Sequence, residues 1–192
     1  VTGSKNVIIG YAAMGDGVSD AANTVAVGYK ALEATTATNN TAVGYQAAQT
    51  VIGGYNVFMG ENAGKGATDC ATHSSVIIGR QAMGGGDASS AHSNVAVGYM
   101  SSYASSTANL NTAVGYKSLY ITTTGNYNVA IGDLALSGNI GGSRQVAVGH
   151  EAMRMFSQAG DVQNTAVGQK AMYNIQTGSH NTAVGNEAMF GA

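Results

Sequence analysis

The stretch Asn-Thr-Ala-Val-Gly stands at Asn40–Gly44 and returns unchanged at Asn111–Gly115, Asn164–Gly168 and Asn181–Gly185. Seven near-copies fill the rest of the chain, and they end at Gly10, Gly28, Gly60, Gly79, Gly98, Gly132 and Gly149. The steps between successive glycines are 18, 16, 16, 19, 19, 17, 17, 17, 19 and 17 residues. A nearly constant period over the whole chain predicts a β-solenoid of about eleven stacked coils of 16–19 residues.

The residues just before each repeat glycine predict a short strand. Positions are counted from that glycine, so that −1 is the residue before it. Position −1 is always apolar, position −3 is always Val or Thr, and position −2 is usually Ala. β-Branched residues favour extended backbone, and the period of two gives such a strand one bulky face and one tight face.

The residues after the glycine predict a second buried segment and then a turn. Position +3 is Ala in nine units and Ser in two, and position +4 is often Met or Leu. All the length variation falls in the polar stretch that follows, which is typical of exposed turns. The longest turns, Lys65–Ser74, Gly84–Ser93 and Met155–Gln163, are candidates for recognition, although they can equally be simple connectors.

Two repeated positions have structural interpretations. The repeat glycine is explained either by a bend that needs a positive φ or by close approach of another backbone, and the sequence leaves both open. Position −4 is usually Asn, and stacked amides can bond to one another along a solenoid axis. The predicted asparagine ladder consists of Asn6, Asn40, Asn56, Asn94, Asn111, Asn128, Asn164 and Asn181, with Thr24, Ser75 and Gln145 in the other units.

The composition excludes several classes of function. Charged residues are 9% of the chain, against roughly 25% in ordinary soluble domains. The net charge of −2 and the scattered Lys and Arg residues give no support to nucleic-acid binding. No apolar run reaches the ~18 residues of a membrane span. Cys70 is alone, the four histidines are isolated, and no catalytic arrangement recurs, so we expect no enzyme activity, metal or cofactor.

The motifs resemble a known family of repeats. "NVAIG" and "NTAVG" followed by a polar pair and Ala are similar to the head repeat of YadA-like trimeric autotransporter adhesins. The longer unit "NTAVGYKSLYITTTGNYNVAIGDLAL" (Asn111–Leu136) looks still more like repeats of phage tail fibres. The resemblance implies a left-handed parallel β-roll in a side-by-side homotrimer. It also implies an extracellular role in host attachment, as part of a virion or of a cell-surface appendage.

Trimerisation is also an expectation from the residues themselves. With so few charges, we expect a lone roll to expose an apolar stripe of alanines that suits an identical neighbour. The chain begins at Val1 without an initiator Met, so we interpret residues 1–192 as a single β-solenoid domain from a longer fibre protein.

Position +1 carries the remaining candidate site. It is a tyrosine in five units, and a ladder of tyrosines either stacks on sugar rings, as a possible glycan-binding site, or covers the roll as a surface ladder. The predicted residues are Tyr11, Tyr29, Tyr45, Tyr99 and Tyr116. The first functional hypothesis is a phage tail fibre. The alternatives are the head of a bacterial adhesin and, from another class, an ice-binding protein.

Overall fold

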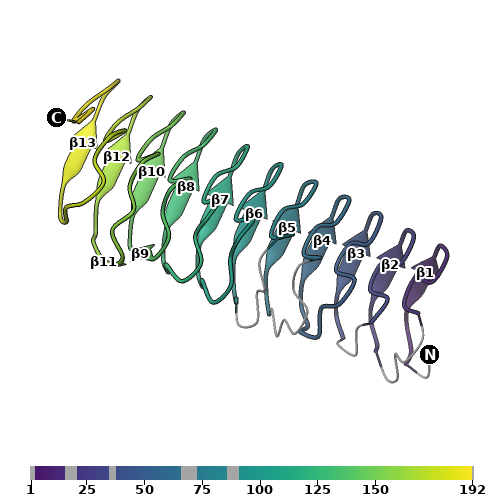
Figure 1. Cartoon of the computed structure of the whole chain (residues 1–192). Coiled ribbons are helices and arrows are strands. Elements are labelled where there is room, and N and C mark those ends of the chain that lie inside the picture. The colour runs from purple at the N-terminus through teal and green to yellow at the C-terminus, as the bar shows by residue number, and fades with distance from the viewer. Residues whose placement is uncertain (1–2, 16–20, 35–37, 66–72, 86–90, 192) are drawn as a thin grey trace.

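The structure, a computed structural model, describes residues 3–15, 21–34, 38–65, 73–85 and 91–191. These residues form strands, turns and bends but no helix. The chain winds into a parallel β-solenoid whose coils follow one another from the N-terminus to the C-terminus (Figure 1). The prediction of an all-β solenoid is therefore confirmed.

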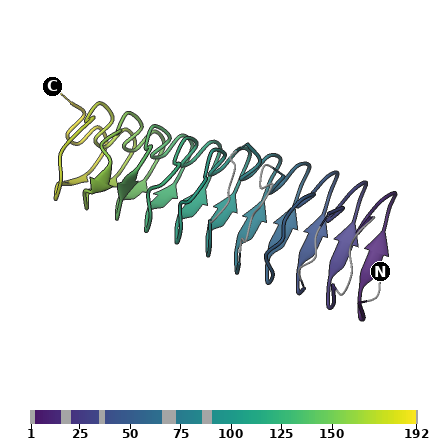
Figure 2. The same cartoon turned by 60° about the horizontal axis from the view of Figure 1, so that its bottom comes forward.

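One long parallel sheet runs along the solenoid. Its strands pair in the order β1-β2-β3-β4-β5-β6-β7-β8-β10-β12-β13, and each strand lies beside the next along one side of the molecule (Figure 2). In every pair the −3, −2 and −1 residues face their equivalents, as in Thr112↔Val129. The strands are β1 (Val7–Ile9), β2 (Val25–Val27), β3 (Thr41–Val43), β4 (Val57–Met59), β5 (Val76–Ile78), β6 (Val95–Val97), β7 (Thr112–Val114), β8 (Val129–Ile131), β10 (Val146–Val148), β12 (Thr165–Val167) and β13 (Thr182–Val184).

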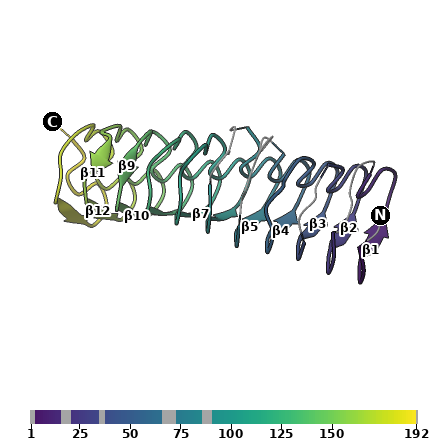
Figure 3. The same ribbon diagram turned by 90° about the horizontal axis from the view of Figure 1, so that it is seen from below.

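A second, two-stranded sheet lies in the turns near the C-terminal end. Strand β9 (Gly142–Ser143) pairs in parallel with β11 (Gly160–Asp161) (Figure 3). β11 belongs to the predicted turn Met155–Gln163, whose Phe156 is fully buried, so part of this turn is built into the core. Of the other two predicted turns, residues 66–72, which include Cys70, and residues 86–90 lie outside the described residues.

The interior of each coil is lined by small residues from the strand and larger ones from the turn after it. The −2 alanines of β2, β3, β6, β7, β8, β10 and β12 are fully buried. The large partners come from position +4, where Leu32, Leu119, Leu136, Met153 and Met172 are also fully buried. The stacked coils thus bury one continuous apolar core, which no single coil could form.

This arrangement corrects one prediction. The alanines of the strands do not form an exposed stripe, because their side chains point into the core while the bulky −3 and −1 side chains point outward. The physical reason is that the −2 and +4 side chains fill the interior of a coil together, and in most coils a small −2 residue accompanies a large +4 residue. Other pairings also occur, since Ile77 and Met83 are both buried in the coil of β5. The coil of β4 reverses the usual order. There Phe58 replaces alanine, and Gly64 stands at +4 where a Cβ would collide with the Phe58 ring.

The repeat glycine satisfies both explanations that the sequence left open. The eleven glycines have φ between +126° and +139°, a region that side-chain-bearing residues rarely adopt. In addition, a Cβ on Gly132 would lie 2.5 Å from the carbonyl oxygen of Gly149 in the next coil. Gly185 has the same conformation at φ +129°, but its nearest neighbour would be the Ala188 Cβ at 3.9 Å.

Candidate functional site

The most extensive candidate site is the outward side of the long sheet, which we call the outer face. It consists of the −3 and −1 side chains of the eleven strands. None of these side chains is charged, and in most strands both are at least partly exposed, as in the burial pattern of β7. Ile9, Met59, Ile131 and Val184 are 59%, 42%, 40% and 70% exposed. Position −1 is apolar in all eleven strands, and position −3 is Val in seven and Thr in four. An uncharged, largely apolar face of this length is typical of an interaction surface.

The charged side chains that the structure describes lie outside the outer face, in the turns and along its two borders. Arg80 Nε lies 3.2 Å from Glu61 Oε2 across adjacent coils, and Lys30 Nζ lies 2.8 Å from Glu33 Oε1. The carboxylate of Glu151 is nearly buried and is surrounded by Arg154, Lys170 and His150. The pairs Arg80–Glu61 and Lys170–Glu151 join neighbouring coils, whereas Lys30–Glu33 and Arg154–Glu151 lie within one coil. None of them places a charge on the outer face.

The predicted asparagine ladder runs inside the solenoid, and its bonds join side chain to backbone. The Oδ1 atom of Asn111 accepts a hydrogen bond from the Asn128 N–H (2.8 Å), while its Nδ2 donates to the Gly125 carbonyl (2.8 Å). Equivalent Oδ1 bonds are made by Asn6, Asn40, Asn56, Asn94, Asn128 and Asn164.

The amide-to-amide bonds that the sequence predicted are the minority within the described residues. They join Asn56 to Asn40 (3.1 Å) and Asn181 to Asn164 (3.2 Å). Backbone N–H groups need acceptors in every coil, and a buried amide oxygen above each of them meets that need. The position therefore serves the stacking of coils.

The three residues that replace asparagine at position −4 behave differently. The Ser75 Oγ atom still accepts from the Asn94 N–H (3.2 Å). Thr24 instead donates to the Ala22 carbonyl (3.1 Å). Gln145 is fully buried, and its Oε1 atom has no hydrogen-bond partner among the described residues. The side-chain ladder is therefore interrupted at Thr24 and Gln145.

A second ladder at position −6 was missed by the sequence analysis. The backbone N–H groups of His92, Asn109 and Asn126 donate to the side chains of Asn109, Asn126 and Ser143 in the following coils. His73 takes part in the same way, because its Nδ1 atom accepts from the Gly54 N–H (3.2 Å). Residue types vary at this position, so no consensus marks it. The four residues that accept these bonds, His73, Asn109, Asn126 and Ser143, share only a side-chain acceptor.

The five predicted tyrosines form two stacks on the surface. Tyr29 lies between Tyr11 and Tyr45, with ring centroids 5.5 and 5.1 Å apart, and Tyr99 stacks on Tyr116 at 5.4 Å. A sugar ring binds to the face of an aromatic ring, and within these stacks the faces lie against neighbouring rings. The surface-ladder interpretation therefore accounts for the geometry with fewer assumptions.

Further ring stacks occur at position +5, which the sequence analysis did not single out. Tyr103 stacks on Tyr120 and Tyr173 on Phe190, at 5.4 and 5.3 Å. The Lys117 ammonium lies 5.1 Å from the Tyr120 centroid and 5.3 Å from that of Tyr116. Identical positions in successive coils stack their side chains, so any aromatic pair one period apart gives such a stack.

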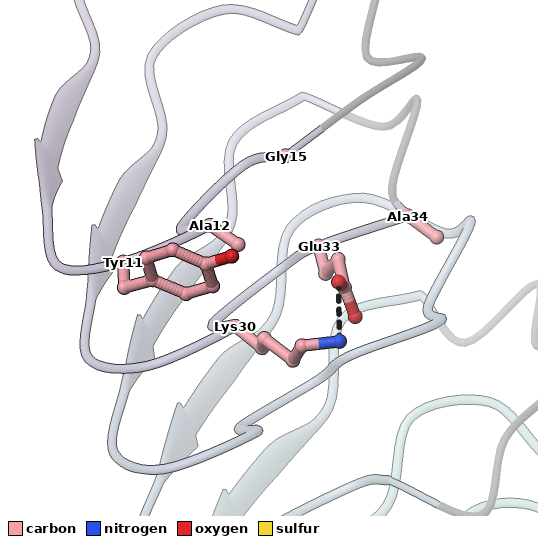
Figure 4. A pocket seen from close by; sticks show the side chains of 6 residues that line it. All are labelled: Tyr11, Ala12, Gly15, Lys30, Glu33 and Ala34. Atoms are coloured by element: carbon pink, nitrogen blue, oxygen red, sulfur yellow. Dashed lines mark ion pairs between the residues drawn. The ribbon is translucent and has the colours of Figure 1, made fainter.

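A surface hollow of about 390 Å³ lies at the N-terminal end (Figure 4). Tyr11, Ala12 and Gly15 line it from one coil, and Lys30 and Glu33 from the next. The hydrogen bond between the last two raises the pKa of Lys30 and lowers that of Glu33. The two charged groups of the hollow are thus already paired with one another, and nothing in its lining selects a particular ligand.

The histidines are not gathered into a metal site. Within the described residues no group of three or more His, Cys, Asp or Glu side chains could hold a metal ion. His73 stacks on His92, and His150 Nε2 lies 3.7 Å from Asp133 Oδ2.

The part of the chain that the structure describes has no helix with the length and apolar character needed to cross a bilayer. Comparison of the chain with protein-family models, with curated proteins and with solved structures finds no match.

Proposed function

We propose that this protein is a structural and attachment protein that assembles side by side into a left-handed homotrimeric β-roll of about eleven coils. The trimer forms the shaft or head of an extracellular fibre, as in a phage tail fibre. It projects turns toward a host-cell glycan or protein. Its function is mechanical spacing and presentation, and it has no catalytic role, cofactor or nucleic-acid partner.

The uncharged outer face is the observation that carries the proposal. Eleven strands spaced ~4.8 Å apart make this face nearly 50 Å long. A monomer would leave this apolar surface in water along its whole length, at an unfavourable free energy of roughly 25 cal/mol for each Å². Covering it is therefore strongly favourable, and the charged turns remain in solvent.

The occupant best suited to this face is a second copy of the same chain. The face has a regular rise from strand to strand, and only a surface with the same rise can match it over eleven strands. A second copy of the chain has the same rise because it consists of the same strands. Closed cyclic symmetry then limits the number of copies, and the resemblance of the repeats to trimeric fibres favours three.

A matched pair of substitutions tests the proposal. Thr165 lies on the outer face, and Thr177 is exposed in a turn away from it. Light scattering of the unaltered protein is expected to give three times the chain mass of 19.2 kDa. Thr165→Glu should yield folded monomers, because three carboxylates would meet at the interface, whereas Thr177→Glu should leave the trimer intact.

Circular dichroism of both variants controls for folding. A soluble, folded monomer of the unaltered chain would overturn the proposal, as would a trimer that Thr165→Glu leaves unchanged. Loss of β-signal in Thr165→Glu would require the same test at Thr112, which occupies the equivalent position in β7.

A further inference from the structure

The outer face is bordered by two rows of exposed side chains. One row, the early edge, is position −5, just before each strand. The other, the late edge, is position +1, just after the glycine. Because the strand lies between them in every coil, the two rows lie on opposite sides of the outer face. In a cyclic trimer built on this face, one side of each subunit meets the opposite side of the next.

The early edge contains three exposed apolar residues among mainly polar ones. Tyr55, Leu110 and Tyr127 are 68%, 47% and 54% exposed. The remaining residues of this row are Lys5, Asn23, Asn39, Ser74, Ser93, Arg144, Gln163 and His180. The early edge thus carries its apolar groups in only three coils, those of β4, β7 and β8.

The late edge carries its tyrosines in the coils of β1, β2, β3, β6 and β7. It has Glu61 in the coil of β4 and Asp133 in the coil of β8. Contact between edges of equal coil number would therefore place Tyr55 against Glu61 and Tyr127 against Asp133. Contact with the following coil would place Leu110 against Asp133.

In a third arrangement, the early edge of each coil contacts the late edge of the preceding coil in the neighbouring subunit. This offset of one coil toward the N-terminus removes the contacts between large side chains and carboxylates. It places Leu110 against Tyr99 and Tyr127 against Tyr116, and in the β4 coil it likewise brings Tyr55 to Tyr45. Each exposed apolar residue of the early edge then meets a tyrosine.

The same offset has an electrostatic consequence. It places Arg144 of one subunit against Asp133 of the next. Within their own chain Arg144 forms an ion pair with Asp161, and Asp133 Oδ2 lies 3.7 Å from His150 Nε2. Both side chains nevertheless remain about half exposed, so each can also take part in a contact across an interface. No other offset of one coil or less pairs these opposite charges.

We infer that the trimer interface joins the early edge of one subunit to the late edge of the next with an offset of one coil, so that Leu110 contacts Tyr99 of the neighbouring subunit. This inference rests on the proposed trimer and adds its register. Because cyclic symmetry holds equivalent coils at the same height, the offset fixes the tilt of the coils relative to the three-fold axis. It also provides specificity that the uniform outer face lacks, because a face of equivalent strands alone permits slippage.

Disulfide trapping tests the register in a Cys70→Ser background. A disulfide requires Cα atoms about 4.4–6.8 Å apart, and an error of one coil displaces one partner by ~4.8 Å. The variant Leu110→Cys/Tyr99→Cys should form a covalent trimer on mild oxidation, seen on a non-reducing denaturing gel. The matched variant Leu110→Cys/Tyr116→Cys, which reports equal coil numbers, should remain monomeric on the same gel.

Each result decides the question. The offset is overturned if Leu110→Cys/Tyr116→Cys forms the disulfide and Leu110→Cys/Tyr99→Cys does not. It is also overturned if the protein is a trimer by light scattering but neither variant forms a disulfide. Covalent dimers of the single variant Leu110→Cys would show a two-fold arrangement and would also overturn it. Monomers by light scattering before oxidation would instead contradict the trimer itself, so the two failures are distinguishable.

Discussion

The backbone N–H of Asn128 donates a 2.8 Å hydrogen bond to the Oδ1 atom of Asn111, which stands 17 residues earlier in the chain. Asn111 is 2% exposed and also donates from Nδ2 to the Gly125 carbonyl. One side chain thus satisfies a donor and an acceptor that coil stacking would otherwise leave buried and unpaired. Its removal is expected to be costly.

Asn111→Ala should lower the free energy of unfolding by about 2–5 kcal/mol, because each unpaired buried group costs ~1–3 kcal/mol. Denaturant unfolding followed by circular dichroism measures the change. Asn174→Ala, at an exposed site, is the matched control and should stay within ~0.5 kcal/mol of the unaltered protein. Equal effects of the two substitutions would show that the ladder contributes nothing specific.

Gln145→Asn should stabilise the protein by about 1 kcal/mol. The substitution shortens a side chain whose Oε1 has no partner among the described residues, and it restores the residue that accepts the next N–H elsewhere in the ladder. The expected result is a higher midpoint of thermal unfolding. Gln176→Asn, in an exposed turn, controls for the change of residue type and should leave the midpoint unchanged. A lower midpoint for Gln145→Asn would mean that its bond to Asn139 matters more than the ladder.

Gly132→Ala and Gly185→Ala separate the two roles of the repeat glycine. Both have φ near +130°, so both substitutions carry the backbone strain of about 1–3 kcal/mol. Only Gly132 has the next coil 2.5 Å from the position of the new Cβ. Gly132→Ala should therefore be the more destabilising substitution by a clear margin, measured by denaturant unfolding. If the two variants were equally stable, close approach would not be the reason for glycine.

Phe58 and Gly64 should behave as an energetically coupled pair. Phe58→Ala leaves a cavity and should cost about 3–5 kcal/mol. Gly64→Leu alone should also destabilise, because the Phe58 ring occupies the space that a side chain would need. The double variant recreates the small −2 and large +4 pairing seen with Ala113 and Leu119 in the coil of β7.

A double-mutant cycle measures this coupling. The double variant should recover most of the loss of Phe58→Ala, because it replaces one filling of the core by another that the same backbone already accommodates. The left-handed backbone at +4 is no obstacle, since Leu119 adopts φ +48° at the equivalent place. Simple additivity of the two single losses would contradict the packing argument.

The sequence by itself determined the repeat and its stacking. The recurring glycine, the β-branched residue at −3 and the apolar residue at −1 predicted short parallel strands in register, and eleven strands pair in that way. Local backbone preference and the periodicity of the residues determine these features, so a single sequence is enough to predict them. The sequence also predicted that each strand has a bulky and a tight face.

Only the tertiary structure decided which of these faces is inside. Alternation distinguishes two faces, but the choice depends on the width of the closed coil and on what the turn contributes to its interior. Here Leu119 and its equivalents at +4 fill the core, so Ala113 and its equivalents point inward and Val114 outward. The −6 ladder was hidden for a related reason. Chemically different side chains can supply the same acceptor, and only the stacked backbone shows that His73, Asn109 and Ser143 occupy one position.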